Sequence, residues 1–269
     1  MSGILWSQEE IDNLHSFYGG NSSWEDILRF LPGREKTSIQ KKAQLLGIHR
    51  KNIRRRKYFQ DEDCFDTPNI MNSYFAGLIA TDGCINFSTV DKVNLEITLK
   101  DKEPLLELKN FTKFTGDVRR KYKNEECPYW RLVIFSVKIC KDLKRNFNIE
   151  PRKTFILEPP TLLSLENSLA FIIGFVDGDG SVLLNKKDKV TNRTSPSLCF
   201  HGKYSVLEWI RETLDNLFPP SRSPNKIGRD KSIYSYRIDG QRALELIRFL
   251  REIPVPKLSR KWDQEWIMP

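Results

Sequence analysis

The most regular feature of the chain is a pattern of apolar and polar segments that occurs twice along its length. Each copy starts with a short apolar run, at residues 71–81 and again at 169–178. A bilayer span needs roughly 20 apolar residues, so these runs predict two short buried helices. The alternating and amphipathic segments that follow each run predict the same order of elements, with two strands, a helix, two strands and a final helix.

The predicted boundaries make the two copies directly comparable. After the first apolar helix we expect elements at 84–89, 93–100, 103–114, 117–122, 129–136 and 138–147. After the second we expect them at 181–186, 196–201, 204–217, 225–229, 233–238 and 240–252. Because a repeat of this length indicates two similar structural units, the sequence predicts an α+β fold with two αββαββα repeats, 71–160 and 161–269. The alternation within 93–100 predicts antiparallel sheets with one buried and one polar face.

Both apolar helices carry small residues one turn apart. Gly77 and Thr81 in the first helix, and Gly174 and Gly178 in the second, leave one face of each helix with little side chain. If the two helices pair through these faces, their backbones can approach closely. The sequence therefore predicts that the two repeats meet along this pair of helices.

Each apolar helix ends in Asp-Gly, and the two Asp residues are the main candidates for chemistry. An Asp-Gly helix end is ordinary by itself, because glycine tolerates the left-handed conformation that ends many helices. Helix pairing, however, would set Asp82 and Asp179 side by side, and two ionised carboxylates at short range repel unless a cation lies between them. Carboxylate oxygens prefer hard cations such as Mg²⁺. The duplication therefore favours a metal site over a purely structural role.

Both apolar runs resemble the LAGLIDADG motif of homing endonucleases. Residues 172–180, Ile-Ile-Gly-Phe-Val-Asp-Gly-Asp-Gly, are the better copy, whereas residues 75–83 depart from the motif at Ala80, where the family has its first acid. The family's metal-binding acid is the second one, which both copies retain. We therefore expect the departure at Ala80 to affect the local helix end more than catalysis. The resemblance covers the chain from about residue 70 to residue 269.

The resemblance implies a fold, a cofactor and an activity. It implies a curved antiparallel sheet that faces DNA, and Mg²⁺ (or Mn²⁺) held by Asp82 and Asp179 together with the backbone carbonyls of Thr81 and Gly178. The implied reaction is metal-dependent hydrolysis of both strands of double-stranded DNA at a long, specific site, with staggered cuts. Since one chain contains two unlike halves, we expect it to act as a monomer on an asymmetric target.

A lysine near the scissile phosphate is a further implication of the resemblance. The dipeptide Arg-Lys follows the last predicted helix of each repeat and ends at Lys153 and at Lys261. We expect both lysines to be catalytic, with Lys257 as a competitor for the role in the second repeat and ordinary surface basicity as the alternative. Lys100 and His201 are expected at roughly equivalent strand ends.

The first 57 residues predict a separate three-helix module. Ser7 and Glu10 have the spacing of a capping box before one amphipathic helix, and a third helix is expected from about Thr37 to Leu46. The spacing of Trp6, Trp24 and Ile39 resembles a Myb/SANT-like repeat, which implies a helix-turn-helix DNA-binding domain. A protein-binding three-helix module remains the alternative. Residues 58–70 are polar and are expected to form a linker.

Charge favours a nucleic-acid partner. The chain has a net charge of +9, which suits a polyanion, and no candidate membrane segment supports a membrane surface instead. An acid-free run extends from the third helix into a basic arm, and basic residues on the predicted strands add to the polar sheet faces. The predicted DNA-binding residues are Lys36, Lys41, Lys42, Arg50, Lys51, Arg54, Arg55, Arg56 and Lys57 in the run, and Lys100, Arg119, Lys121, Arg229 and Arg237 on the sheets.

The remaining composition excludes several classes of protein. The five cysteines are scattered without a Cys-x-x-Cys pair, and there are only three histidines, so structural zinc and histidine-based catalysis have little material. The N-terminal residues lack a charged region followed by an apolar stretch, so an intracellular protein is expected. Two alternatives to the endonuclease stay open: an intron RNA maturase with intron RNA as its partner, and a catalytically silent DNA-binding regulator.

Overall fold

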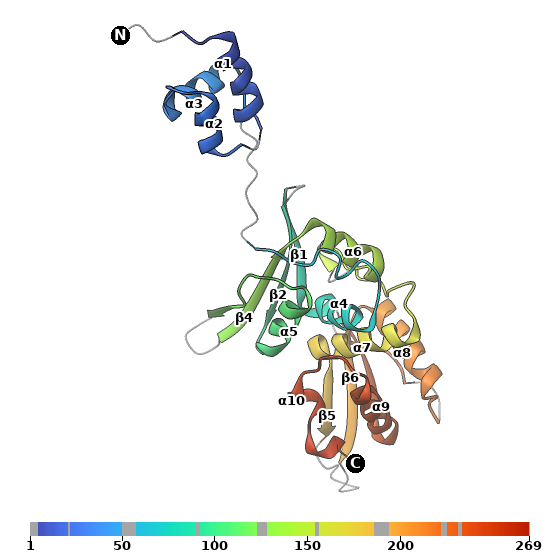
Figure 1. The fold of residues 1–269 in the computed structure, drawn as a ribbon. Helices are drawn as coiled ribbons and strands as arrows, with labels where there is room; N and C mark the ends of the chain where they lie inside the picture. Colours follow the sequence, from blue (N-terminus) through green and yellow to red (C-terminus); the bar gives the residue numbers. More distant parts are fainter. Residues whose placement is uncertain are drawn as a thin grey trace. The chain divides into compact units, whose positions relative to one another are not determined.

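The computed structural model describes residues 5–20, 22–49, 58–89, 92–122, 128–153, 156–185, 194–221, 225–230 and 233–268. The chain divides into two compact units, Met1–Lys57 and Tyr58–Pro269 (Figure 1). The predicted basic arm, Arg50, Lys51 and Arg54 to Lys57, lies outside the described residues.

The smaller unit contains three helical segments. They are α1 (Gln8–Asn13), continued by a π-helical turn η1 (Leu14–Tyr18), then α2 (Trp24–Phe30) and α3 (Lys36–Leu45). The predicted capping box is present, because the Ser7 hydroxyl accepts a hydrogen bond from Glu10 N (3.1 Å) and the Glu10 carboxylate accepts one from Ser7 N (2.9 Å). A small apolar core holds the segments together and consists of Leu14, Ile27, Leu31, Ile39 and Ala43.

The larger unit repeats one order of elements. The first repeat has α4 (Ile70–Asp82), β1 (Gly83–Thr89), β2 (Lys92–Leu99), α5 (Glu103–Phe111), β3 (Arg119–Tyr122), β4 (Pro128–Phe135) and α6 (Val137–Phe147). The second has α7 (Leu165–Asp179), β5 (Ser181–Asn185), β6 (Ser195–Gly202), α8 (Tyr204–Leu217), β7 (Gly228–Asp230), β8 (Ile233–Asp239) and α9 (Gly240–Glu252), followed by α10 (Ser259–Trp262) and η3 (Glu265–Ile267). The predicted α+β fold of two αββαββα repeats is confirmed.

Two four-stranded antiparallel sheets, ordered β1-β2-β4-β3 and β5-β6-β8-β7, form the body of this unit. The predicted alternation along β2 is also confirmed, since Val93, Leu95, Ile97 and Leu99 are buried. The intervening polar side chains of β2 lie on the opposite, open face of the sheet, as the period of two requires.

The two sheets have the same register relative to their Asp-Gly helix ends. Cys84 lies opposite Glu96 in the first sheet, and Ser181 lies opposite Cys199 in the second. Because Cys84 and Ser181 each stand two residues after the motif Asp, Glu96 and Cys199 are equivalent positions.

This register corrects the expected equivalence of Lys100 with His201. Thr98 and His201 each follow the equivalent residues Glu96 and Cys199 by two positions. Lys100 and Lys203 follow them by four positions. The counterpart of Lys100 is therefore Lys203, and the counterpart of His201 is Thr98.

Helices α4 and α7 pack side by side at the centre of the unit (Figure 1). A Cβ atom added to Gly77 would lie 2.0 Å from Phe171 O, and one added to Gly174 would lie 1.9 Å from Tyr74 O. Carbon and oxygen atoms cannot approach so closely, so only glycine fits at both positions. The predicted seam between the repeats thus depends on backbone-to-backbone contact.

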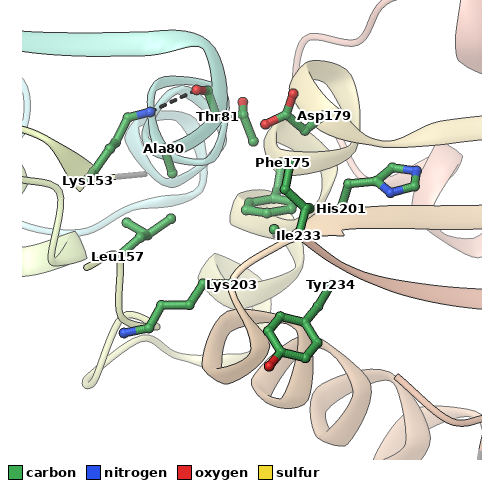
Figure 2. Close-up of a pocket in the computed structure, with 11 residues that line it drawn as sticks. Ala80, Thr81, Lys153, Leu157, Phe175, Asp179, His201, Lys203, Ile233 and Tyr234 are labelled. Atoms are coloured by element: carbon green, nitrogen blue, oxygen red, sulfur yellow. Dashed lines mark hydrogen bonds between the residues drawn. The ribbon is translucent and has the colours of Figure 1, made fainter. Parts of the chain in front are cut away.

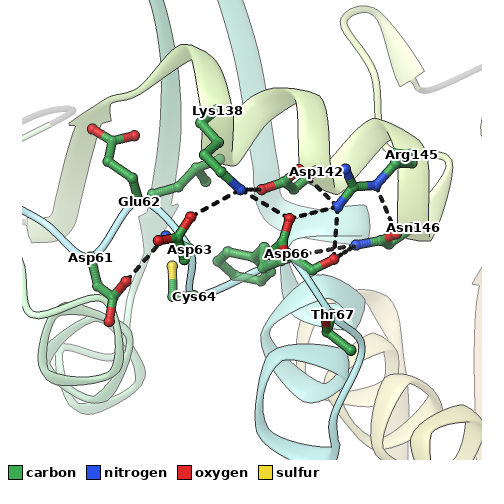
Figure 3. Close-up of polar contacts among 12 residues, drawn as sticks. Asp61, Glu62, Asp63, Cys64, Asp66, Thr67, Lys138, Asp142, Arg145 and Asn146 are labelled. Carbon is green, nitrogen blue, oxygen red and sulfur yellow. Dashed lines mark hydrogen bonds and ion pairs between the residues drawn. The ribbon is translucent and has the colours of Figure 1, made fainter.

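The segment expected as a linker packs against the larger unit instead (Figure 3). Phe65 is fully buried in the core, and Asn72 donates hydrogen bonds to Cys64 O (3.1 Å) and Thr67 O (2.8 Å). Lys138 of α6 forms ion pairs with Asp63, Asp66 and the buried Asp142. These contacts tie the acidic segment to α6, so its charges stabilise the fold rather than keep the segment solvated.

Candidate active site

The candidate site lies where the C-terminal ends of α4 and α7 meet. A Cβ atom added to Gly178 would lie 1.8 Å from Thr81 Oγ1 and 3.0 Å from Asp82 Oδ2. The Asp82 carboxylate of one repeat therefore lies beside the backbone that leads directly into Asp179 of the other. The structure brings together the two carboxylates that the sequence identified.

The electrostatics of the site are asymmetric. Asp82 is partly buried, whereas Asp179 is exposed to solvent. Burial, followed by the negative charge of Asp179, raises the pKa of Asp82 from its usual 3.8 to about 6, although Lys261 and Lys153 oppose the shift. The two carboxylates therefore repel each other at the seam, and a cation between them would relieve this repulsion.

The two predicted lysines bind the carbonyl ends of the two central helices. Lys153 Nζ donates a hydrogen bond to Thr81 O (2.8 Å; Figure 2). Lys261 Nζ contacts four carbonyls at the α7 end, with Val176 O and Asp177 O at 2.7 Å, Gly180 O at 2.9 Å and Gly178 O at 3.3 Å. A cation at a helix C-terminus also complements the helix dipole.

Burial lowers the pKa of both lysines, and that of Lys261 falls to about 8. Lys257 lies elsewhere, because its Nζ donates to Ile253 O and Val255 O. Between the two candidates of the second repeat, it is thus Lys261 that lies at the seam.

Asp177 has a role that the sequence interpretation did not identify. Its buried carboxylate accepts hydrogen bonds from Tyr74 Oη (2.9 Å), Trp262 Nε1 (2.7 Å) and Leu258 N (3.1 Å). It thereby ties α7 both to α4 and to the segment that carries Lys261. The first repeat has Ala80 at this position, so the Lys153 side lacks the equivalent contacts.

A cavity of about 390 Å³ opens on the Ala80 side of the seam. Both repeats contribute to its walls, and Figure 2 shows Lys153 and Thr81 facing Asp179 and His201 across it. The two halves of the site therefore differ in shape. The Lys153 half is open to this cavity, whereas hydrogen bonds to Asp177 close the Lys261 half. His201 lines this cavity together with Asp179.

Comparison with solved structures identifies the fold. The homing endonuclease I-WcaI, solved bound to its DNA recognition sequence, is 19% identical to this chain, and the match covers 82% of this chain and 97% of I-WcaI with a TM-score of 0.53. The fold is that of the LAGLIDADG homing endonucleases. The LAGLIDADG meganuclease I-AabMI, solved bound to uncleaved DNA, is 15% identical, and the match covers 70% of this chain and 85% of I-AabMI with a TM-score of 0.46. I-SmaMI, solved bound to an uncleaved DNA target in the presence of calcium ions, is 14% identical, and the match covers 72% of this chain and 87% of I-SmaMI with a TM-score of 0.45. No protein-family model matches the sequence, and no curated protein does.

The open sheet face of the first repeat carries predicted DNA-binding residues. Arg119 lies opposite Arg131 and Lys121 lies opposite Tyr129, all on the face away from the helices. Arg131 is paired with Glu96 at 2.6 Å, whereas Arg119 and Lys121 have no ion-pair partner among the described residues. Their charges are therefore available to an anionic ligand.

In the second repeat the sheet face differs from the expectation. Arg237 lies on the open face but is paired with Asp239 at 2.8 Å. Strand β7 begins at Gly228 rather than at residue 225. Arg229 lies opposite Tyr234, on the helix-covered side of the sheet, and its guanidinium is 5.8 Å from the centre of the tyrosine ring. Its counterpart Arg120 lies 5.9 Å from Trp130 in the same way, so these two arginines stack on aromatic rings at the sheet edges.

The remaining predicted residues are exposed or partly exposed. Lys36 and Lys41 of α3 are exposed and Lys42 is partly exposed, and Lys100 is exposed just after β2.

None of the helices in the described residues combines the length and apolar character that crossing a bilayer requires.

Proposed function

We propose that this chain is a site-specific endonuclease that hydrolyses both strands of double-stranded DNA with the help of a divalent cation. The observation that carries the proposal is the meeting of Asp82 and Asp179 at the glycine seam, where the charge of one raises the pKa of the other. Two repelling carboxylates at a partly buried seam cost stability unless a cation joins them.

The donor set at the seam suits Mg²⁺ or Mn²⁺. The carboxylates of Asp82 and Asp179 and the carbonyls of Thr81 and Gly178 are all hard oxygen donors. The two carbonyls accept hydrogen bonds from Lys153 and Lys261, and each keeps a second lone pair for a cation. Mg²⁺ usually keeps several waters and takes only one or two carboxylates from the protein, so this small set is sufficient. Within the described ranges there is no cluster of three or more His, Cys, Asp or Glu side chains that could hold a metal, which makes the paired carboxylates the best candidates there. A bound divalent cation would supply a more acidic water and charge stabilisation at the phosphate oxygens.

The lysines complete the site as positioned cations. A lysine with a pKa of about 8 remains mostly protonated at pH 7, so Lys261 can stabilise the negative charge that develops on the phosphate. Lys153 lies at the end of α4 as Lys261 lies at the end of α7. We propose that Lys153 stabilises the same charge during cleavage of the other DNA strand. Both ammonium groups are held by backbone carbonyls, which restricts their motion and prepares them for this role.

Double-stranded DNA is the proposed substrate because positive charge lies on an open sheet face. The exposed Arg119 and Lys121 would contact DNA from the first sheet, with Lys100 at its end and Arg237 on the second sheet. The smaller unit, whose α3 carries Lys36, Lys41 and Lys42, is proposed as an additional Myb/SANT-like DNA-binding module. Because the two repeats differ in sequence, a single chain would recognise an asymmetric target as a monomer.

The deciding experiment is a cleavage assay on DNA that flanks the insertion point of the gene itself. We expect a staggered double-strand break with Mg²⁺, none with EDTA, and none with the variants Asp82→Asn or Asp179→Asn, which should still bind the DNA. Specific binding without cleavage in Mg²⁺ and in Mn²⁺ would identify a silent DNA-binding regulator instead. Splicing of an intron RNA with no DNA cleavage would identify a maturase.

A further inference from the structure

The first repeat contains an apolar groove that shares no lining residue with the cavity beside the motif Asp residues. It lies between the edge strand β1 and helix α6 and has a volume of about 460 Å³. Its polar rim consists of Lys141, Lys144 and Glu150, and its apolar lining consists of Ile85, Phe87, Val93, Val137, Cys140 and Ile149. Phe87 is 62% exposed, although its ring is large and apolar. Exposed apolar surface with a polar rim is typical of an interaction site.

The internal repeat identifies the counterpart of this groove. Val133 of β4 and Arg237 of β8 occupy equivalent positions, because Val133 lies opposite Glu96 and Arg237 lies opposite Cys199. Continuing the alignment into the following helices makes Lys144 of α6 the counterpart of Arg248 of α9. The corresponding groove of the second repeat therefore lies between β5 and α9.

The C-terminal segment of the chain fills this second groove. Gln264 Nε2 donates a hydrogen bond to Val182 O of β5 (3.2 Å), and Ile267 is buried between the strand and the helix. Arg248 donates to Ile267 O and to Met268 O, both at 2.9 Å. Figure 1 shows the C-terminus beside β5 and α9. In this repeat the occupant is thus a short turn with an apolar anchor, whose carbonyls are held by a basic residue of the helix.

The first repeat does not fill its groove in this way, because after Lys153 its chain leads to α7 and the groove beside β1 stays open. Its groove nevertheless retains the corresponding features. Apolar side chains form the floor, and Lys144 stands at the position of the carbonyl-binding Arg248. Lys144 is paired with Glu150 (2.7 Å), and the exposed Lys141 has no ion-pair partner in the part of the chain that the structure describes.

We propose that the groove between β1 and α6 binds a short peptide segment of a partner protein. The segment would insert an aromatic or aliphatic side chain, as Ile267 does in the second repeat, and would carry an acidic residue to pair with Lys141. Because Glu150 neutralises Lys144, the positive charge of Lys141 remains at the rim and disfavours basic segments. The occupant of the second groove supplies the apolar part of this chemistry, since Trp266 adjoins the buried Ile267, and Glu265 of the same segment is exposed. The position of Lys141 is taken by Glu245 in the second repeat, so the acidic residue is expected for the first groove alone.

The probe is a fluorescent peptide with the sequence of residues 262–268, titrated against the full chain without DNA or metal. We expect saturable binding that Lys141→Glu weakens at least fivefold and that the peptide change Glu265→Lys restores in that variant. Phe87→Ala should weaken binding by a similar factor. Lys109→Glu, a charge reversal on α5, is the matched control and should leave binding unchanged.

Methyl resonances locate the binding site. The peptide should shift the resonances of Ile85, Val93 and Val137 in the first repeat. No saturable binding, binding that is insensitive to Lys141→Glu and Phe87→Ala, or shifts confined to Val182 and Ile247 in the second repeat would each overturn the proposal. Since neither DNA nor metal is present, the result does not depend on the proposed endonuclease activity.

Discussion

Removal of the Asp179 charge tests the paired carboxylates directly, without any substrate. The pKa of Asp82 is raised from 3.8 to about 6, so ionising this side chain costs roughly 3 kcal/mol more in the folded protein than in the unfolded chain. Burial is the larger cause and the charge of Asp179 is the second. Asp179→Asn removes only the second cause. The pKa of Asp82 should therefore fall but stay above 3.8, and the metal-free protein should gain on the order of 1 kcal/mol of stability at pH 7.

The sign of the pH dependence follows from the direction of the shift. A carboxyl group with a raised folded-state pKa favours folding most below pH 3.8, and this contribution is lost as the pH rises through about 6. In EDTA, the free energy of unfolding of the wild type should therefore decline across this window, and Asp179→Asn should decline less. With saturating Mg²⁺ the order should reverse, because only the wild type retains both carboxylates for the cation.

Two measurements check this prediction: a ¹³C-detected titration of the Asp82 carboxyl, and urea unfolding at several pH values in EDTA. Glu166→Gln is the matched control, because it removes one negative charge from the opposite end of α7 and should leave the pKa of Asp82 unchanged. If Asp179→Asn leaves the pKa of Asp82 at about 6, the carboxylates do not interact and the argument for a shared cation site fails.

Three further predictions concern the lysines, the seam and the smaller unit. Lys261→Ala should slow single-turnover cleavage by roughly ten- to a thousandfold with little loss of DNA affinity, whereas Lys257→Ala should leave the chemical step nearly unchanged; the reverse result would move the assignment to Lys257. Gly174→Ala should destabilise the larger unit by about 3 kcal/mol or more in urea unfolding, because its Cβ would lie 1.9 Å from a backbone oxygen. Gly228→Ala, whose Cβ would have its nearest neighbour at 3.6 Å, should change the free energy of unfolding by no more than about 0.5 kcal/mol. Deleting residues 1–57, which removes eleven basic and six acidic residues, should weaken DNA binding and flatten its salt dependence without moving the cut, and an unchanged salt slope would instead favour a protein-binding role.

The sequence by itself determined the order of elements and the location of the central seam. Apolar periodicity is a local property, so helices and strands could be assigned from neighbouring residues alone. The internal repeat added long-range information, because similar segments fold into similar units and must meet through similar surfaces. That is why the pairing of Gly77 with the α7 backbone, and the meeting of Asp82 with Asp179, could be predicted without coordinates.

Only the tertiary structure decided which face each strand residue occupies and what ties the repeats together. Side chains alternate with a period of two, so the register that pairs Arg229 with Tyr234 puts Arg229 on the helix-covered face instead of the expected one. The hydrogen bonds of Asp177 to Tyr74 and Trp262 span 103 and 85 residues of chain, a separation at which no local pattern carries a signal. Local chemistry selects the elements, whereas the register between distant strands and the packing of distant segments select the surfaces that those elements present.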